Sequence, residues 1–106
     1  MRIFKNVWFS RFAEREGISD GELKAVVNRL EIGQINAELG GGVYKQRLAR
    51  PGSGKSGGYR VILFFRSGEL TFFHYGYSKS DIANISGKDL RSFKEVAKEY
   101  LAMTGK

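Results

Sequence analysis

The stretch YRVILFFRSGELTFFHYGY, residues 59–77, decides the fold that the sequence predicts. Residues 59–66 are rich in β-branched and aromatic side chains and are apolar on both faces in the middle, which is typical of a central strand. Ser67 and Gly68 predict a tight turn, and residues 70–77 predict a second aromatic strand. We therefore expect an antiparallel hairpin at the centre of a sheet.

A third strand is predicted upstream of this hairpin, directly after three consecutive glycines that end at residue 42. Residues 43–48 alternate, and alternate side chains of a strand point to opposite faces of the sheet. Lys45 and Arg47 therefore share one face. Residues 50–58 contain four glycines, the only proline and two serines, so they predict a long hairpin loop.

Helices flank these strands. Asn6 is suited to cap a helix that ends at Gly17 and carries an apolar stripe. Ser19 and Glu22 form a capping box for a second amphipathic helix that ends at Gly33. Each helix needs a partner surface that covers its stripe.

Residues 2–5 predict a short first strand, and residues 86–103 predict a last amphipathic helix. The expected order is β, α, α, β, β, β, α, which makes an α+β fold. We expect a small antiparallel β-meander with the two N-terminal helices on one face, a C-terminal helix, and the other face free to bind. The length of 106 residues predicts a single domain, residues 1–106.

Positive charge is concentrated in the predicted strands and their loop. No acidic residue occurs between Glu38 and Glu69, and the basic residues of this interval account for nearly all of the formal net charge of +7. They are Lys45, Arg47, Arg50, Lys55, Arg60 and Arg66. A localised positive charge predicts a polyanionic partner, and its placement among strands favours nucleic acid over a membrane surface.

The composition excludes several other classes of protein. The chain has no cysteine and one histidine, so no disulfide framework and no metal centre are expected. Residues 61–65 form the longest apolar run, far short of the ~20 residues that span a bilayer. We therefore expect a cytoplasmic protein with no membrane partner and no small-molecule cofactor.

Two motifs invite a catalytic interpretation that their surroundings weaken. Residues 49–56, ARPGSGKS, match a relaxed phosphate-binding loop, but strand sequence follows where that mechanism needs a helix N-terminus. His74 lies in mid-strand without a paired acid, which favours a structural role over that of a general base.

The basic residues predict a phosphate site. Lys45 and Arg47 are about 7 Å apart on one strand face, Arg60 begins the neighbouring strand, and Lys55 lies in the loop between them. Such cations bind a phosphate and also stabilise the extra charge of its phosphorane-like transition state. The alternative is a basic face that binds RNA without chemistry.

Tyrosines alternate with these cations and predict either base stacking or core packing. Tyr44 and Tyr59 are candidates for substrate binding. By simple alternation, Tyr75 and Tyr77 share a face with Phe73, and Tyr77 is expected to reach solvent near the strand end.

Residues 40–47, 54–62 and 77–81 together resemble the RelE/HigB-like toxins of bacterial type II toxin–antitoxin systems. The resemblance covers nearly the whole chain and implies a RelE-like fold. It further implies a metal-independent endoribonuclease that cuts mRNA on the ribosome, with a cognate antitoxin as its protein partner. Related toxins of the ParE type poison DNA gyrase on a similar fold, so a gyrase poison and a non-catalytic RNA-binding module stay open as alternatives.

The resemblance and the charge pattern together give a predicted site. Arg47 and Arg60 are expected to stabilise transition-state charge, Lys45 or Lys55 to orient the phosphate or act as base, and Tyr77 to act as acid. The full predicted catalytic set is Lys45, Arg47, Lys55, Arg60, Tyr77 and Lys79, and the predicted substrate-binding set is Tyr44, Arg50 and Tyr59.

Overall fold

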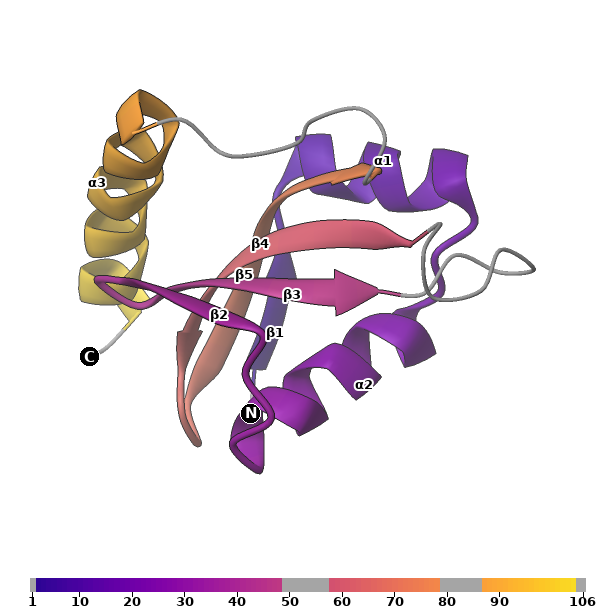
Figure 1. Cartoon of the computed structure of the whole chain (residues 1–106), viewed down its shortest axis with the longest axis horizontal. Coiled ribbons are helices and arrows are strands. Elements are labelled where there is room, and N and C mark those ends of the chain that lie inside the picture. Colours follow the sequence, from indigo (N-terminus) through magenta and orange to yellow (C-terminus); the bar gives the residue numbers. More distant parts are fainter. Residues whose placement is uncertain (1, 49–57, 79–86, 105–106) are drawn as a thin grey trace.

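A computed structural model describes residues 2–48, 58–78 and 87–104. Figure 1 shows a sheet with two helices on one side and the C-terminal helix on the other. The elements are β1 (Arg2–Lys5), α1 (Val7–Glu16), α2 (Asp20–Glu31), β2 (Ala37–Gly40), β3 (Val43–Leu48), β4 (Tyr59–Arg66), β5 (Leu70–Ser78) and α3 (Gly87–Thr104). This architecture confirms the predicted α+β fold. No described helix is both long and apolar enough to cross a membrane.

The sheet has the strand order β1-β5-β4-β3-β2, with β4 at its centre. Strands β3, β4 and β5 form the predicted antiparallel meander, and β1 pairs with β5 in parallel. The sequence interpretation missed β2, a strand of four residues that pairs antiparallel with β3. Its turn is built by Gly40, Gly41 and Gly42, which all have positive φ, a conformation that only glycine adopts without cost.

Local capping signals predicted the first two helices correctly. The side chain of Asn6 accepts a hydrogen bond from the Phe9 amide at 2.7 Å, and Gly17 ends α1 in the left-handed conformation. Ser19 and Glu22 form both hydrogen bonds of a capping box at the start of α2.

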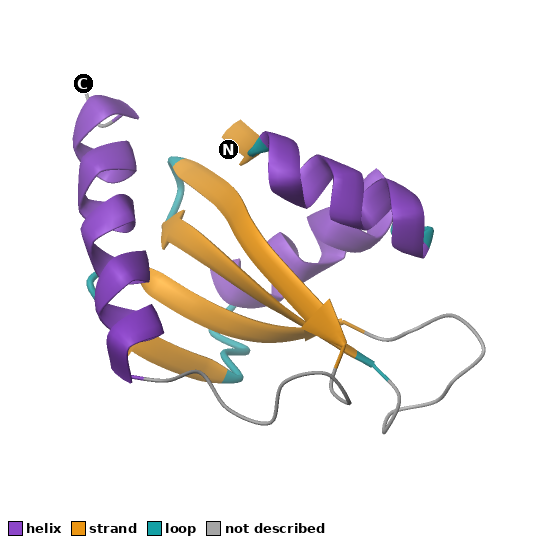
Figure 2. Cartoon of the chain, turned by 90° about the horizontal axis from the view of Figure 1, so that it is seen from above, coloured by secondary structure: helices purple, strands orange, loops and turns teal. Residues whose placement is uncertain are grey.

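Helices lie on both faces of the sheet, as the view from above shows (Figure 2), and a cluster of apolar side chains is buried on each face. The face toward α1 and α2 buries Phe9 and Phe12 against strand residues such as Leu63. The opposite face packs against α3, which contributes Ala97 to a second cluster. The expectation that this second face is free was therefore wrong in part, because α3 needs a surface that covers its own apolar stripe.

A β-bulge in β5 changes which residues share a face. Ile62 pairs with Tyr75 and Leu63 pairs with Phe73, so His74 is the extra residue. An extra residue reverses the alternation that follows it. Phe73 accordingly lies in the core toward α1, whereas Tyr77 joins the cluster under α3. The prediction that Tyr77 and Phe73 share a face was therefore wrong.

Candidate functional site

Three predicted site residues lie side by side across the central strands. Arg47 of β3 pairs in register with Arg60 of β4, and Arg60 pairs with Tyr77 of β5. We call these residues the Arg47–Arg60–Tyr77 row. Lys45 lies on the same face, two residues before Arg47. Directly opposed residues have Cβ atoms about 4.5–5.5 Å apart, so the two guanidinium groups are within reach of one phosphate.

The charges of this row are not balanced by the part of the chain that the structure describes. The ion pairs found there are Lys5 with Asp20, Arg15 with Glu16, and Arg66 with Glu69. None of them involves the row or Lys45. Like charges directly opposed on neighbouring strands are destabilising. A fold that keeps such a pair is disfavoured locally and gains by binding an anion there.

A polar loop before β2 fixes the end of β3 that carries Arg47. The Arg47 amide donates to Asn36 Oδ1 at 2.8 Å, and its carbonyl accepts from Arg29 Nη2 at 2.7 Å. The buried side chain of Gln46 accepts from the Asn36 amide at 2.7 Å and donates to the Gln34 carbonyl at 3.1 Å. These supporting residues were not found from the sequence, because a polar loop offers no periodic signal.

Arg66 contacts the end of α3 and not the row. Its Nε lies 3.4 Å from Glu69 Oε2, and its Nη2 donates to the Leu101 carbonyl at 2.9 Å. A cation near the last carbonyls of a helix interacts favourably with the helix dipole. Arg66 therefore secures the end of α3 and does not add its charge to the row.

Tyr77 is buried, with 5% of its surface exposed, so the expectation that it reaches solvent was wrong. The bulge turns its ring into the cluster beneath α3. Burial raises the pKa of the Tyr77 hydroxyl; the charge of Arg60 lowers this pKa and Tyr75 raises it further. The hydroxyl is therefore protonated at neutral pH.

Tyr44 and Tyr59 lie on the opposite face of the sheet from the row. Tyr59 is 2% exposed and donates a hydrogen bond to Glu16 Oε1 at 2.8 Å. The Tyr44 hydroxyl lies 3.4 Å from Glu38 Oε2. Burial, and then the charge of Glu38, raise the pKa of this hydroxyl. Strand alternation thus separates both tyrosines from their basic neighbours, so the structure does not bring them together with the row, and their role in substrate binding stays a prediction.

Arg50, Lys55 and Lys79 lie outside the described residues, as does the loop-like motif at residues 49–56. The element that follows this motif is strand β4, which confirms the predicted strand and differs from the helix that a phosphate-binding loop needs. Among the described residues, the predicted catalytic residues that lie together are those of the Arg47–Arg60–Tyr77 row and Lys45.

His74 has the surroundings of a structural residue, in agreement with the favoured interpretation. Its carbonyl accepts from Asn6 Nδ2 at 2.9 Å, and its Nδ1 lies 3.2 Å from the same nitrogen. The ring stacks on Phe64 and meets Phe93 edge-on. Burial lowers the pKa of His74, so the neutral ring is favoured.

This burial predicts a pH dependence of stability. A histidine whose folded pKa is lowered stabilises the fold fully above its unfolded pKa of about 6.5, and that contribution is lost as the pH falls below it. We expect the thermal midpoint of the wild type to fall more between pH 7.5 and 5.5 than that of His74→Asn, whose Oδ1 still accepts from Asn6. Thermal melts followed by circular dichroism measure both; equal losses would contradict the prediction.

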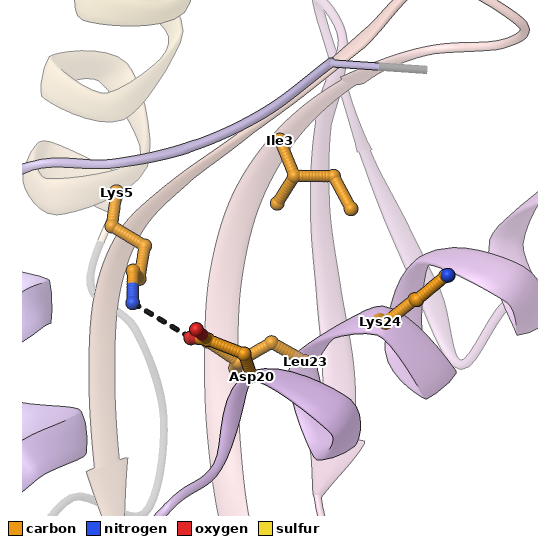
Figure 3. Close-up of a pocket in the computed structure, with 5 residues that line it drawn as sticks. All are labelled: Ile3, Lys5, Asp20, Leu23 and Lys24. Atoms are coloured by element: carbon orange, nitrogen blue, oxygen red, sulfur yellow. Dashed lines mark hydrogen bonds and ion pairs between the residues drawn. The ribbon is translucent and has the colours of Figure 1, made fainter.

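A pocket of about 270 Å³ lies between β1 and α2, at the edge of the sheet (Figure 3). Its polar lining includes Lys5, whose Nζ lies 2.9 Å from Asp20 Oδ1, so that cation is neutralised. Leu23, another lining residue, belongs to the core on the α1 and α2 side. The pocket therefore does not join the row.

Comparison with known proteins identifies the family of this chain. A family model described as the RelE toxin of the RelE/RelB toxin–antitoxin system matches residues 1–106. The search of curated proteins returned no match. The match spans the whole chain, and the five-stranded sheet with three helices agrees with a RelE-like fold. The chain therefore belongs to the RelE toxin family.

Proposed function

We propose that this toxin is a ribosome-dependent mRNA endoribonuclease. The observation that supports this best is the direct opposition of Arg47 and Arg60, on a strand face where no described carboxylate pairs with either. Each guanidinium group is planar and can bind two phosphate oxygens at once, so two such groups suit a phosphate. The ribosome as the place of cleavage is part of the proposal, and the resemblance of the motifs supports it.

In the proposed reaction, the 2′-oxygen of a nucleotide attacks the adjacent phosphorus, and the bond to the 5′-oxygen of the next nucleotide breaks. The products are a 2′,3′-cyclic phosphate and a 5′-hydroxyl. Arg47 and Arg60 stabilise the charge that develops on the phosphorane-like transition state. The 2′-hydroxyl passes its proton to Lys45, which lies on the same face, or to Lys55, and the other lysine orients the phosphate.

Tyr77 is the proposed proton donor to the leaving 5′-oxygen. It lies directly across from Arg60 and holds its proton at neutral pH. Lys55, Lys79 and Arg50 remain predicted contributors from outside the described residues. The protein partner that family membership supports is a RelB-type antitoxin.

Mapping the 5′ ends of cellular mRNA after a brief pulse of expression tests the proposal. We expect new ends that carry a 5′-hydroxyl and lie inside translated regions. Purified protein should produce the same ends on mRNA bound to ribosomes and far fewer on naked mRNA. DNA damage with intact mRNA would instead indicate a gyrase poison, and RNA protection without new ends would indicate a binding module.

A further inference from the structure

Trp8 occupies an unusual position for the largest apolar side chain in the protein. The sequence places it on the apolar stripe of α1 with Phe9 and Phe12, but only those two are buried. Trp8 is 44% exposed. Its ring stacks on Phe12 with centroids 5.5 Å apart and on Tyr75 with centroids 4.5 Å apart. The ring is thus held in place by other rings while much of its surface faces solvent.

The chain path explains why Trp8 meets Tyr75. Strand β1 ends at Lys5, which pairs with Phe73, whereas β5 continues to Ser78. Beyond Lys5, no described strand pairs with that edge of β5, and α1 begins there. Trp8, in the first turn of α1, therefore packs on Tyr75 at this edge.

Aromatic rings connect Trp8 to the cationic row. Tyr75 lies next to Tyr77, with ring centroids 6.1 Å apart, and Tyr77 pairs in register with Arg60. We call Trp8, Tyr75 and Tyr77 the aromatic line. The line leads from the buried tyrosine beside the proposed phosphate site to an exposed indole at the sheet edge.

A cation accompanies the exposed end of this line. Arg11 follows Trp8 by three residues on α1, so the two side chains are neighbours on the helix surface. Arg11 is exposed and takes part in none of the ion pairs found among the described residues. A ring beside a free cation is the combination that binds an unpaired base and its flanking phosphate.

We propose that Trp8 is a stacking platform for an unpaired base of the RNA strand whose phosphate is held by Arg47 and Arg60, and that Arg11 contacts a flanking phosphate. This inference rests on the proposed RNA substrate and extends its binding site to the sheet edge. Stacking on an aromatic ring tolerates any base, so Trp8 contributes affinity and position and not sequence preference.

The protein reports on this contact directly, because Trp8 is its only tryptophan. A short single-stranded oligonucleotide with 2′-O-methyl groups cannot be cleaved through its 2′-oxygen, and it is titrated into wild-type toxin. We expect quenching of the Trp8 emission that saturates together with binding measured by anisotropy of a labelled oligonucleotide. Binding without a change in Trp8 emission would overturn the inference.

Variants distinguish base stacking on Trp8 from non-specific binding of the oligonucleotide. Trp8→Ala should weaken oligonucleotide binding about 5- to 150-fold, the range given by the loss of one base–aromatic stack. Trp8→Phe retains a ring and should stay within about threefold of the wild type. Val7→Ala, which removes a neighbouring apolar side chain that is 69% exposed, is the matched control and should bind as the wild type does.

Separate measurements test folding, the stacking site and the nuclease activity. Circular dichroism checks that Trp8→Ala is folded, and Trp8→Phe keeps the test valid if it is not. The inference would be overturned if the wild type, Trp8→Phe and Trp8→Ala all bound the oligonucleotide equally. It would also be overturned if Trp8→Ala weakened antitoxin binding and left the oligonucleotide affinity unchanged. Quenching of Trp8 in a protein that makes no new mRNA ends would refute the nuclease and leave the stacking site.

Discussion

Replacing Arg60 by Ala is expected to lower the rate of mRNA cleavage by about 10²- to 10³-fold, the usual cost of removing one donor that stabilises transition-state charge. Arg60 is the middle member of the row, between Arg47 and Tyr77, so its loss leaves one guanidinium at the phosphate. Growth arrest on expression should disappear. Primer extension on ribosome-bound mRNA, with growth curves alongside, measures both effects.

The fold should survive this change, because little of the structure depends on the Arg60 side chain. Among the described residues, its hydrogen bond is a long one, from Nη1 to the Tyr59 carbonyl at 3.3 Å. Removing one of two opposed like charges also relieves a repulsion. A circular dichroism melt close to that of the wild type is therefore expected.

Two companion variants sharpen the result. Lys24→Ala removes an exposed cation from α2, on the other side of the sheet, and should leave toxicity unchanged. Arg60→Lys keeps the charge but loses the bidentate geometry and should fall between Ala and the wild type. An Arg60→Ala protein that arrests growth as fast as the wild type would remove the row from the mechanism.

The sequence was a good guide to elements whose signals are local. Asn6, Ser19 and Glu22 gave helix starts, and the alternation in residues 43–48 placed Lys45 and Arg47 on one face, as the structure has them. The distribution of charge also indicated the region of the row, because no acidic residue lies between Glu38 and Glu69.

What the sequence could not give depends on contacts between distant segments. The bulge at His74 depends on the pairing of β5 with β4, where the Asn6 side chain also binds the His74 carbonyl, and it puts Tyr77 on the face toward α3. The face on which α3 packs is likewise a tertiary choice. Trp8 has the spacing of a core residue, and its exposure follows only from where β1 ends.

Gly76→Ala is expected to destabilise the fold strongly. Gly76 is buried in β5 between two tyrosines of the aromatic line, and it pairs with Val61. A Cβ added there would lie 2.4 Å from Phe12 Cε2 and 2.9 Å from its Cδ2. The Phe12 ring has little freedom to move, because it stacks on Trp8 and meets Tyr59 edge-on.

Overpacking of this kind costs about 1–3 kcal/mol, and each kcal/mol lowers the thermal midpoint of a domain near this size by roughly 4–8 °C. Urea and thermal unfolding of Gly76→Ala measure the loss. Gly21→Ala is the matched control: it lies in α2, its added Cβ meets no atom closer than 3.7 Å, and it should be neutral or stabilising by up to about 1 kcal/mol.

The cause can be isolated with a second substitution. Phe12→Leu shortens the side chain that the new Cβ would meet, so the double variant should lose less stability than the two single losses together. Strict additivity, or a Gly76→Ala protein as stable as the wild type, would show that α1 can shift without cost. In that case Trp8 would not be fixed on Tyr75 either, because Trp8 and Phe12 are carried by the same helix and stack on each other.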